Sequence, residues 1–505
     1  MNFIYLVWGK QRLDEPYKTV KYVIDGKTFE TSLVSLAYAR YLIQRGEKVK
    51  ITFFFPASLS DLIQLFTNYA ESKNEINIAE LEQELRKIFI DLIKDVLEGH
   101  SWGLSENDIS VKIVPPINYV SRLSQERIVK ISANYNSVFL CILSSVLNDL
   151  LILSKGENQN RFIADMNQGF NIIVSAMREV VRTSAVISNL YFWGVDGKNQ
   201  FQILFSDPIL GDIKESFSVY IEDINVEKSF YMPFDFRKLN TIKNESLIWE
   251  IFGDDEILKN AILCFYSIYY NLPLLAISYK FQSHKEINEQ IEKAVKNLEG
   301  IIKRVRIEKS KISGESKLTI SFESPKSEQR EHIVNLLISL VLYSSIVKEL
   351  ERYNLKQKQD GISLDELKKF SKIYRHFNLV VNKEILETEL DRIKGNKGIA
   401  SEWKKLSEID LKPAELKPID KEINLRNLIA HSGFEKNITL VKKREKETRA
   451  VKLIAHSGFE KSIILVKKRE KETPAVKKDE DILVKYDTEA VGKIVNLLQR
   501  KIELT

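Results

Sequence analysis

The chain has 505 residues, of which 44% are hydrophobic and 29% are charged, and its formal net charge is +6. This composition excludes an intrinsically disordered chain and predicts two to four folded domains. The small positive charge is compatible with a nucleic-acid partner without requiring one. Cys141 and Cys264 lie within apolar runs, which indicates reduced core thiols and a cytoplasmic protein.

The first 240 residues alternate between strand-like and helix-like segments. Apolar runs predict strands at 3–8, 48–55 and 109–114, and amphipathic spacing predicts helices at 33–44 and 78–98. Such alternation is typical of a parallel, doubly wound α/β sheet of the Rossmann-like kind. The chain has no Gly-x-Gly-x-x-Gly sequence, so a dinucleotide-dependent dehydrogenase is poorly supported.

Ligands of doubly wound sheets bind beyond the carboxyl ends of the strands, and three segments are expected there. They are Trp8, Gly9 and Lys10 at the end of the first strand, Ser32 at the start of a helix, and Asn134, Tyr135 and Asn136 before a long apolar helix. Amide and hydroxyl groups at a helix N-terminus can meet a negatively charged ligand.

A fourth candidate segment has the strongest chemistry. A short strand delivers Asp165, Asn167, Gln168, Gly169 and Asn171 to the start of a helix expected at 172–181. The carboxylate and the amides could read the edges of nucleobases, and a glycine lets the backbone approach a phosphate. An ordinary strand–turn–helix with an Asx cap is the alternative interpretation.

The same segment resembles the Asp-x-Thr-His-Gly-x-Asn type of motif found in CARF domains. Asn167 stands where a Thr or Ser is usual, and Gln168 stands where a His is usual. Both replacements still form hydrogen bonds, so ligand recognition is expected to survive. The resemblance implies a dimeric Rossmann-like domain over 1–240 that binds a cyclic oligoadenylate, with cyclic tetra-adenylate as the expected activator.

Three further strands are expected to extend the first sheet, at 191–195, 201–205 and 217–221. A separate middle segment is then expected at 241–325. It is mostly helical and carries a hairpin of strands 304–309 and 317–322 around Ser313-Gly314, which is similar to a winged helix. We expect this segment to pass movement between the domains that flank it.

The C-terminal domain is expected at 326–505 and to be mostly helical. It begins with a long helix at 327–353, and Ser363 with Glu366 predicts a capping box. The apolar runs around 138–153 and 333–347 are interrupted by polar residues and predict buried helices, so no membrane partner is expected.

A tandem duplication of 25 residues lies near 428–475. Leu428–Lys436 recurs as Leu453–Lys461, and the second copy carries Val451 where the first has Arg426. Two copies are too few for a solenoid, so we interpret them as a duplicated insertion. Strands of one ribbon are expected at 438–441, 463–466 and 482–484.

The residues expected to carry catalysis are Arg426, Asn427 and His431. Arginine presents a permanent positive charge to phosphate oxygens, and histidine moves protons near neutral pH. Together they could cut RNA without a metal ion. Their five-residue spacing places them about 140° apart on a helix, so one helix alone does not direct both at one point. The alternative is a surface arginine with a histidine that caps helix carbonyl groups.

This Arg-Asn-x-x-x-His sequence resembles the Arg-x(4–6)-His motif of HEPN ribonucleases. HEPN domains are helical and usually pair, so the resemblance implies one composite site built from two chains. Arg449 and His456 also match the loose motif. We expect the first copy to be the active one, because a capped helix with an apolar face leads into it.

The order of the two motifs resembles the CRISPR-associated CARF–HEPN ribonucleases of type III systems. The resemblance implies a cyclic-oligoadenylate-activated, metal-independent endoribonuclease that cleaves single-stranded RNA in antiviral defence. It also implies a homodimer or a larger homo-oligomer and no cofactor. The competing hypothesis is a ligand-responsive DNA-binding transcriptional regulator, in which the winged-helix-like segment binds DNA and the Arg–His pair is structural.

Overall fold

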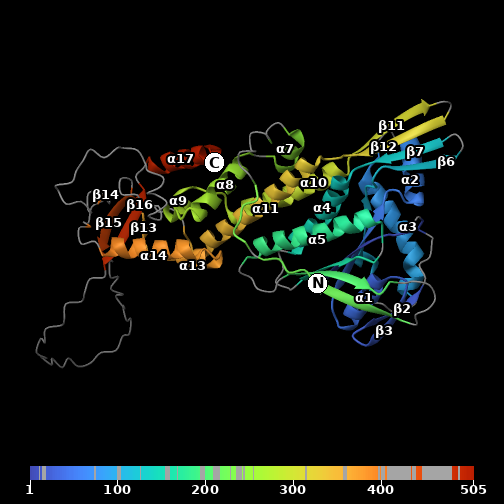
Figure 1. The fold of residues 1–505 in the computed structure, drawn as a ribbon, viewed down its shortest axis with the longest axis horizontal. Coiled ribbons are helices and arrows are strands. Elements are labelled where there is room, and N and C mark those ends of the chain that lie inside the picture. Colours follow the sequence, from blue (N-terminus) through green and yellow to red (C-terminus); the bar gives the residue numbers. More distant parts are fainter. Residues whose placement is uncertain are drawn as a thin grey trace, which may run out of the picture. The chain divides into compact units, whose positions relative to one another are not determined.

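The computed structural model describes most of the first 395 residues and several segments beyond them (Figure 1). It describes residues 1–395 except 11, 14–18, 73–75, 99–103, 125–126, 154–159, 168, 194–198, 209–215, 228, 235–241, 243–244, 254, 313–314 and 356–360, and then Ile399, 404–405, Phe434, 439–445, 480–486 and 489–504. The chain forms two compact units, one of Met1–Ile262 with Gln282–Val347 and one of Leu263–Phe281 with Lys348–Thr505. The domain ranges expected from the sequence stay predictions.

An eight-stranded sheet organises the first unit, and its order is β3-β2-β10-β9-β8-β1-β4-β5. The five parallel strands are β1 (Asn2–Val7), β4 (Val49–Pro56), β5 (Ile109–Val114), β8 (Asn160–Asp165) and β9 (Asn199–Ser206). This confirms the expected Rossmann-like fold. An edge of β10 (Phe217–Asp223), β2 (Val20–Ile24) and β3 (Lys27–Thr31) makes the sheet mixed.

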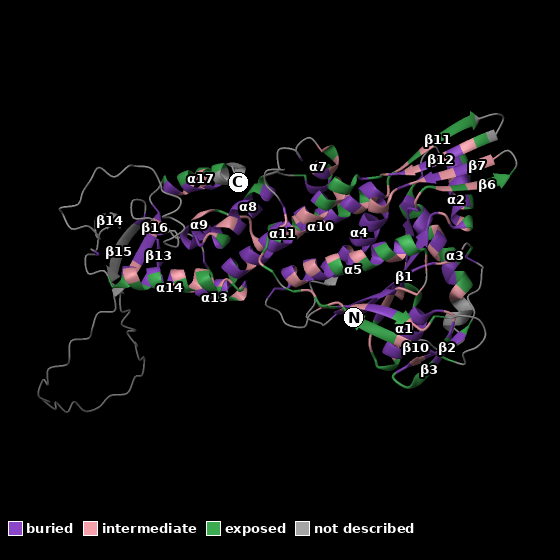
Figure 2. Ribbon diagram, in the orientation of Figure 1, coloured by how far each residue is buried: buried purple, intermediate pink, exposed green. Residues whose placement is uncertain are grey.

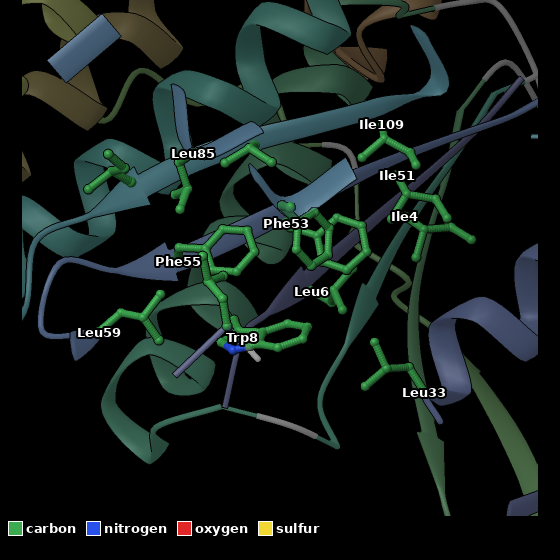
Figure 3. Packing of buried hydrophobic residues seen from close by; sticks show 14 of the residues in the cluster. Ile4, Leu6, Trp8, Leu33, Ile51, Phe53, Phe55, Leu59, Leu85 and Ile109 are labelled. Atoms are coloured by element: carbon green, nitrogen blue, oxygen red, sulfur yellow. The ribbon is translucent and has the colours of Figure 1, made fainter. Parts of the chain in front are cut away.

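The central strands of the sheet are buried on both faces, because helices cover each face. On one face, the ring of Phe162 stacks on those of Phe3 and Phe201, and helices α4 (Tyr135–Leu153) and α5 (Asn171–Tyr191) pack together beside it. The other face holds a cluster that includes Trp8, Phe53 and Phe55, seen in Figure 3.

Three helices contribute to this second cluster. They are α1 (Val34–Gln44), α2 (Ser60–Ser72) and α3 (Ile78–Glu98). The bounds of α1 and α3 confirm the helices expected at 33–44 and 78–98. The strand expected at 191–195 is wrong over its described part, because α5 continues to Tyr191 and residues 192–193 form a turn. Residues 194–195 lie outside the described part of the chain.

A second sheet has four strands in the order β11-β12-β7-β6, and we call it the hairpin sheet. Its strands are β6 (Tyr119–Ser124), β7 (Arg127–Ser132), β11 (Val305–Ile312) and β12 (Glu315–Phe322). The expected hairpin in the middle segment is therefore present. It is not a free wing, because β12 pairs in parallel with β7 from the N-terminal half.

The middle of the chain is helical, as expected. Its helices are α7 (Ser246–Phe252), α8 (Asp255–Tyr269), α9 (Pro273–Ser278), α10 (His284–Ile302) and α11 (Ser327–Arg352). Among the described residues, α11 alone is long and apolar enough to cross a membrane. Its most apolar window is 78% buried inside the protein, which fits the expected core helix.

The second unit holds short helices and a small sheet. Besides α9, its described helices include α12 (Leu364–Leu367), α13 (Phe370–His376), α14 (Val380–Lys394) and α17 (Ala490–Leu504). The sheet joins β13 (Ile362–Ser363), β16 (Glu480–Tyr486), β15 (Thr439–Glu445) and β14 (Lys404–Lys405) in this order. The capping box at Ser363 is confirmed.

The expected C-terminal ribbon is confirmed where it can be seen. β15 and β16 pair in antiparallel register, with Val441 opposite Val484. The strand expected at 463–466 in the second copy of the repeat lies outside the described residues.

Candidate functional site

The chain after β8 lies at the end of β1, where the order of the sheet changes direction. β4 and β5 continue from one side of β1, and β8 and β9 continue from the other. Gly169 has a φ of +109°, and a Cβ atom there would lie 2.6 Å from the Cβ of Val7. Only a glycine lets this loop approach β1 so closely. Doubly wound sheets bind ligands at such a switch point.

Asp165, the last residue of β8, holds the loop that follows this strand. Its side chain is buried, and Oδ1 accepts hydrogen bonds from the backbone N of Asn167 (2.9 Å) and from its Nδ2 (2.7 Å). Burial raises the pKa of the Asp165 carboxyl, and the hydrogen bonds from Asn167 and the polar groups of Ser35 partly oppose this rise. The carboxylate therefore holds the loop's shape through Oδ1, while its buried Oδ2 has no hydrogen-bond partner among the described residues.

Asn167 connects the ends of β8 and β9. Its Oδ1 accepts hydrogen bonds from the backbone N (2.6 Å) and the Oγ (3.1 Å) of Ser206. Both the Nδ2 and the Oδ1 of Asn167 already form hydrogen bonds within the protein. Asn167 is therefore better placed to orient the loop than to bind a ligand. The sequence analysis missed Ser206 and Ser35. Ser206 is the last residue of β9 in the same sheet. A polar residue at the carboxyl end of a predicted strand is the signal that could have identified it.

Of the three candidate residues after β1, Trp8 is buried in the core, whereas Gly9 and Lys10 are partly exposed. The Trp8 ring packs on Phe55 and Phe89 with centroid distances of 5.4 Å to each, so its side chain belongs to the core (Figure 3). Gly9 and Lys10 are half-buried and follow β1 at the same edge. Ser32 is half-buried and directly follows β3, two residues before α1 begins.

Asn134, Tyr135 and Asn136 follow β7, which belongs to the hairpin sheet. They therefore do not follow a strand of the main sheet, contrary to the expectation from the sequence. Both amide Nδ2 atoms donate to the carbonyl oxygen of Pro325, at 2.8 Å from Asn134 and 2.9 Å from Asn136. The Tyr135 hydroxyl donates to Glu179 (2.7 Å), and burial with this contact raises the pKa of Tyr135 to about 12. Their described contacts are structural, and ligand contact by them stays a prediction.

Exposed apolar groups surround the start of α5. Phe170 and Ile172 are each more than 40% exposed, and Asn171 between them is exposed. At the end of β9, Phe205 stacks on Tyr220 with a centroid distance of 5.4 Å, and both rings are partly open to solvent. A helix N-terminus attracts phosphate, and open rings can stack on bases. Gln168 lies outside the described residues.

Arg426, Asn427 and His431 also lie outside the described residues. Phe434, three positions after His431, is described and fully buried. Two other histidines have carboxylates nearby, which the sequence did not reveal. His332 Nδ1 lies 3.5 Å from Glu245 Oε1, and His376 Nε2 lies 4.0 Å from Glu349.

Within the described part of the chain, no group of three or more His, Cys, Asp and Glu side chains gathers as metal ligands do. The described candidate site offers hydrogen-bonding groups, exposed rings and a helix N-terminus at the end of the main sheet.

Two family models match the chain. "CRISPR system endoribonuclease Csx1, CARF domain" matches residues 3–208, and "CRISPR system endoribonuclease Csx1, HEPN domain" matches residues 379–451. The two matches occur in the expected order and together cover more than half of the chain. No curated protein matches the sequence.

Proposed function

Because the chain belongs to the CRISPR-associated CARF–HEPN ribonucleases, we propose that it is an endoribonuclease switched on by a cyclic oligoadenylate. One observation supports this most: each matched range contains one of the two candidate sites. Asp165–Asn171 falls within the CARF match, and Arg426 with His431 falls within the HEPN match. The proposed substrate is single-stranded RNA, and the proposed setting is type III CRISPR defence in the cytoplasm.

The activator we propose is cyclic tetra-adenylate, held beyond the ends of β1 and β8. The close approach of Gly169 to Val7 leaves the loop backbone at the edge of the sheet. Asn171 is exposed at the start of α5, where the helix dipole favours a phosphate. A four-fold adenylate ring is larger than one such loop, which is why we propose that two chains share it.

In the proposed catalytic site, one residue stabilises negative charge and another handles a proton. The ribose 2′-oxygen attacks phosphorus, a bond to phosphorus forms, and the bond to the 5′-oxygen breaks. Arg426 stabilises the negative charge of the phosphorane, and His431 takes the 2′-OH proton or orients that hydroxyl. The departing 5′-oxygen gains a proton. Asn427 positions either partner, and no metal ion is needed for these steps.

We assign catalysis to the first copy of the repeat. The HEPN match ends at residue 451, so it includes His431 and stops before His456. Val451 in the second copy replaces Arg426 and cannot stabilise a phosphorane.

Activation requires coupling between two separate sites. A ligand shifts an equilibrium only by as much as it prefers one state over the other. The cyclic oligoadenylate must therefore bind more tightly to the dimer state in which the two Arg–His pairs align, and such couplings typically amount to about 1–3 kcal/mol.

The testing experiment measures cleavage of single-stranded RNA with and without cyclic tetra-adenylate, in buffer containing EDTA. We expect activated cleavage by the unaltered chain, and none by Arg426→Ala or His431→Ala, which should still bind the activator. His456→Ala is the matched control and should keep most activity. A gel shift with duplex DNA runs beside it. Activator-dependent DNA binding without RNA cleavage would refute the proposal in favour of a transcriptional regulator.

A further inference from the structure

The hairpin sheet has one covered face and one open face. Its inner face contributes Leu318, Ile320 and Phe322 to the hydrophobic core, and Phe322 meets Phe66 of α2 edge-on at a centroid distance of 6.2 Å. Strand side chains alternate, so the neighbouring residues point away from α2. Figure 2 shows exposed residues along the edge strands β6 and β11.

This outer face is basic. The strand register places four cations on it, one from each strand. They are Arg122 on β6, Lys130 on β7, Arg306 on β11 and Lys317 on β12. Among the outer-face side chains that the structure describes, Glu308 is the single acid.

Three of these cations have no acidic partner among the residues that the structure describes. Lys130, Arg306 and Lys317 form no ion pair with any described residue, whereas nearby Arg127 and Arg304 are paired with Glu71 and Glu250. Lys130 and Lys317 occupy diagonal positions on neighbouring parallel strands, because Lys317 lies two residues before Thr319, the register partner of Lys130. Like charges in these positions repel each other, and a bound anion would relieve the repulsion.

The basic surface continues around the tip of the sheet. A cavity of about 440 Å³ lies there beside the end of α2. Its lining includes the cations Arg127, Lys309, Lys311 and Lys317, the residues Ser310 and Ser316, and one acid, Glu71, which is paired with Arg127. Lys309 and Lys311 form no ion pair within the described residues. By the strand register Lys317 belongs to the outer face, whereas Lys309 and Lys311 lie on the inner side with Leu318, so cations are present on both sides of the sheet at its tip.

We propose that the hairpin sheet is a second RNA-binding surface, which holds the phosphate backbone of a single-stranded RNA and is distinct from the Arg–His site. The repeated, unpaired cations fit a chain of phosphates, and neighbouring hydroxyl groups can donate to phosphate oxygens. On the edge strand β6, Val120 and Leu123 are exposed and can contact bases without selecting a sequence. The choice of RNA rests on the proposed function.

The shape of the surface favours a single strand over duplex DNA. Four strands at the usual spacing measure about 14 Å between the edge backbones. A two-stranded ribbon fits the major groove of DNA, which is about 12 Å wide, but a four-stranded sheet does not. An extended single strand can lie flat across it.

The experiment measures binding of the full chain, without activator, to a fluorescein-labelled 2′-O-methyl RNA of about 20 nucleotides, which cannot be cleaved through its 2′-position. The triple variant Lys130→Gln/Arg306→Gln/Lys317→Gln is compared with the control Lys27→Gln/Lys87→Gln/Lys293→Gln. The control removes the same charge from exposed lysines elsewhere in the same unit. Thermal melting verifies that both variants are folded.

We expect the hairpin-sheet variant to bind at least tenfold more weakly, and the control to change less than twofold. If three phosphate contacts are lost, the slope of log K against log salt should become shallower by about 2. The charge-conserving pair Lys130→Arg/Lys317→Arg should keep the affinity of the unaltered chain.

Equal binding by the hairpin-sheet variant and the control would overturn the proposal. So would tighter binding of a duplex DNA of equal length that depends on the same three residues. Activated cleavage is measured separately, so the two proposals can fail independently. Cleavage without hairpin-dependent binding refutes this inference alone, and hairpin-dependent binding without cleavage refutes the proposed catalytic function alone.

Discussion

Gly169 is the residue whose role is fixed most tightly by the structure. Its positive φ already disfavours any side chain, and an added methyl group would meet Val7 at 2.6 Å. Because Val7 belongs to a buried parallel strand, it cannot move aside without disturbing β4 and β8. An alanine at this position must therefore push the loop away from β1.

We expect Gly169→Ala to raise the activator concentration needed for half-maximal cleavage by at least tenfold, and to leave cleavage without activator unchanged. Calorimetry with cyclic tetra-adenylate and an RNA cleavage titration measure the two effects. Gly300→Ala is the control, because Gly300 lies within α10 with no atom close to an added methyl group. Unchanged activation by Gly169→Ala would show that this loop does not bind the activator.

At the residue scale, sequence reasoning identified the polar loop but not how its atoms are used. The spacing from Asp165 to Asn171 follows a strand and precedes a helix, and the structure has that arrangement. The bonds from Asn167 to Ser206 depend on β9 lying next to β8, a pairing between residues about 40 positions apart. Trp8 likewise looked available, because its burial depends on α3, which enters the chain 70 residues later.

At the scale of elements, an ion cluster joins α3, β5 and α10. Lys303 Nζ lies 2.8 Å from both Glu82 Oε2 and Glu299 Oε1, and Lys112 Nζ lies 3.0 Å from Glu299. Glu82 also accepts a hydrogen bond from the backbone N of Ile113 (3.0 Å). The cluster thereby fastens α10, which leads into β11, to the main sheet.

This cluster predicts a pH dependence of stability. Burial alone would raise the pKa of Glu299, but the charges and hydrogen bonds of Lys112 and Lys303 outweigh it and lower the pKa to about 2. A lowered carboxyl pKa stabilises the fold fully above the unfolded value near 4.5, and the contribution is lost as the pH falls towards 2. A shift of this size corresponds to about 3 kcal/mol.

We expect urea unfolding midpoints to fall more steeply between pH 4.5 and pH 2.5 for the unaltered chain than for Glu299→Gln. At pH 7 the variant should be the less stable of the two, since it leaves Lys303 with one carboxylate in place of two. Parallel pH profiles for the two proteins would mean that Glu299 does not contribute through its charge. Glu289→Gln, on the exposed side of the same helix, is the control.

Elements with strong local patterns were predictable, whereas their partners were not. The apolar run at β1, the amphipathic repeat of α3 and the hairpin of β11 with β12 are local signals, and the structure contains each of them. The parallel pairing of β12 with β7 joins residues about 190 positions apart, and no sequence pattern specifies such a pairing. The sequence therefore predicted the β11–β12 hairpin as a separate wing, although β12 is paired with β7 in a four-stranded sheet.

At the scale of the whole chain, the repeat poses the sharpest question. β15 ends at Glu445, β16 begins at Glu480, and these two residues lie opposite each other in the antiparallel pair. Antiparallel neighbours need a connection of only a few residues. Removing residues 448–472 leaves 446–447 and 473–479 as the connection and touches neither strand. The shorter connection should cost about 1 kcal/mol less to close.

We expect this deletion to give a folded enzyme whose activated cleavage and melting temperature are equal to or above those of the intact chain. Deleting 426–450 is the matched control, because it removes the same 25 residues of length and leaves the second copy in their place. The two products differ at only four positions, where Arg426, Asn427, Asn437 and Thr439 are replaced by Val451, Lys452, Ser462 and Ile464. Both retain the His-Ser-Gly-Phe sequence and the strand-forming residues that follow it. If phosphorane stabilisation by Arg426 is essential, the control should fold, bind cyclic tetra-adenylate and fail to cleave RNA. Cleavage by the control, or loss of cleavage when 448–472 is removed, would show that the second copy belongs to the active site.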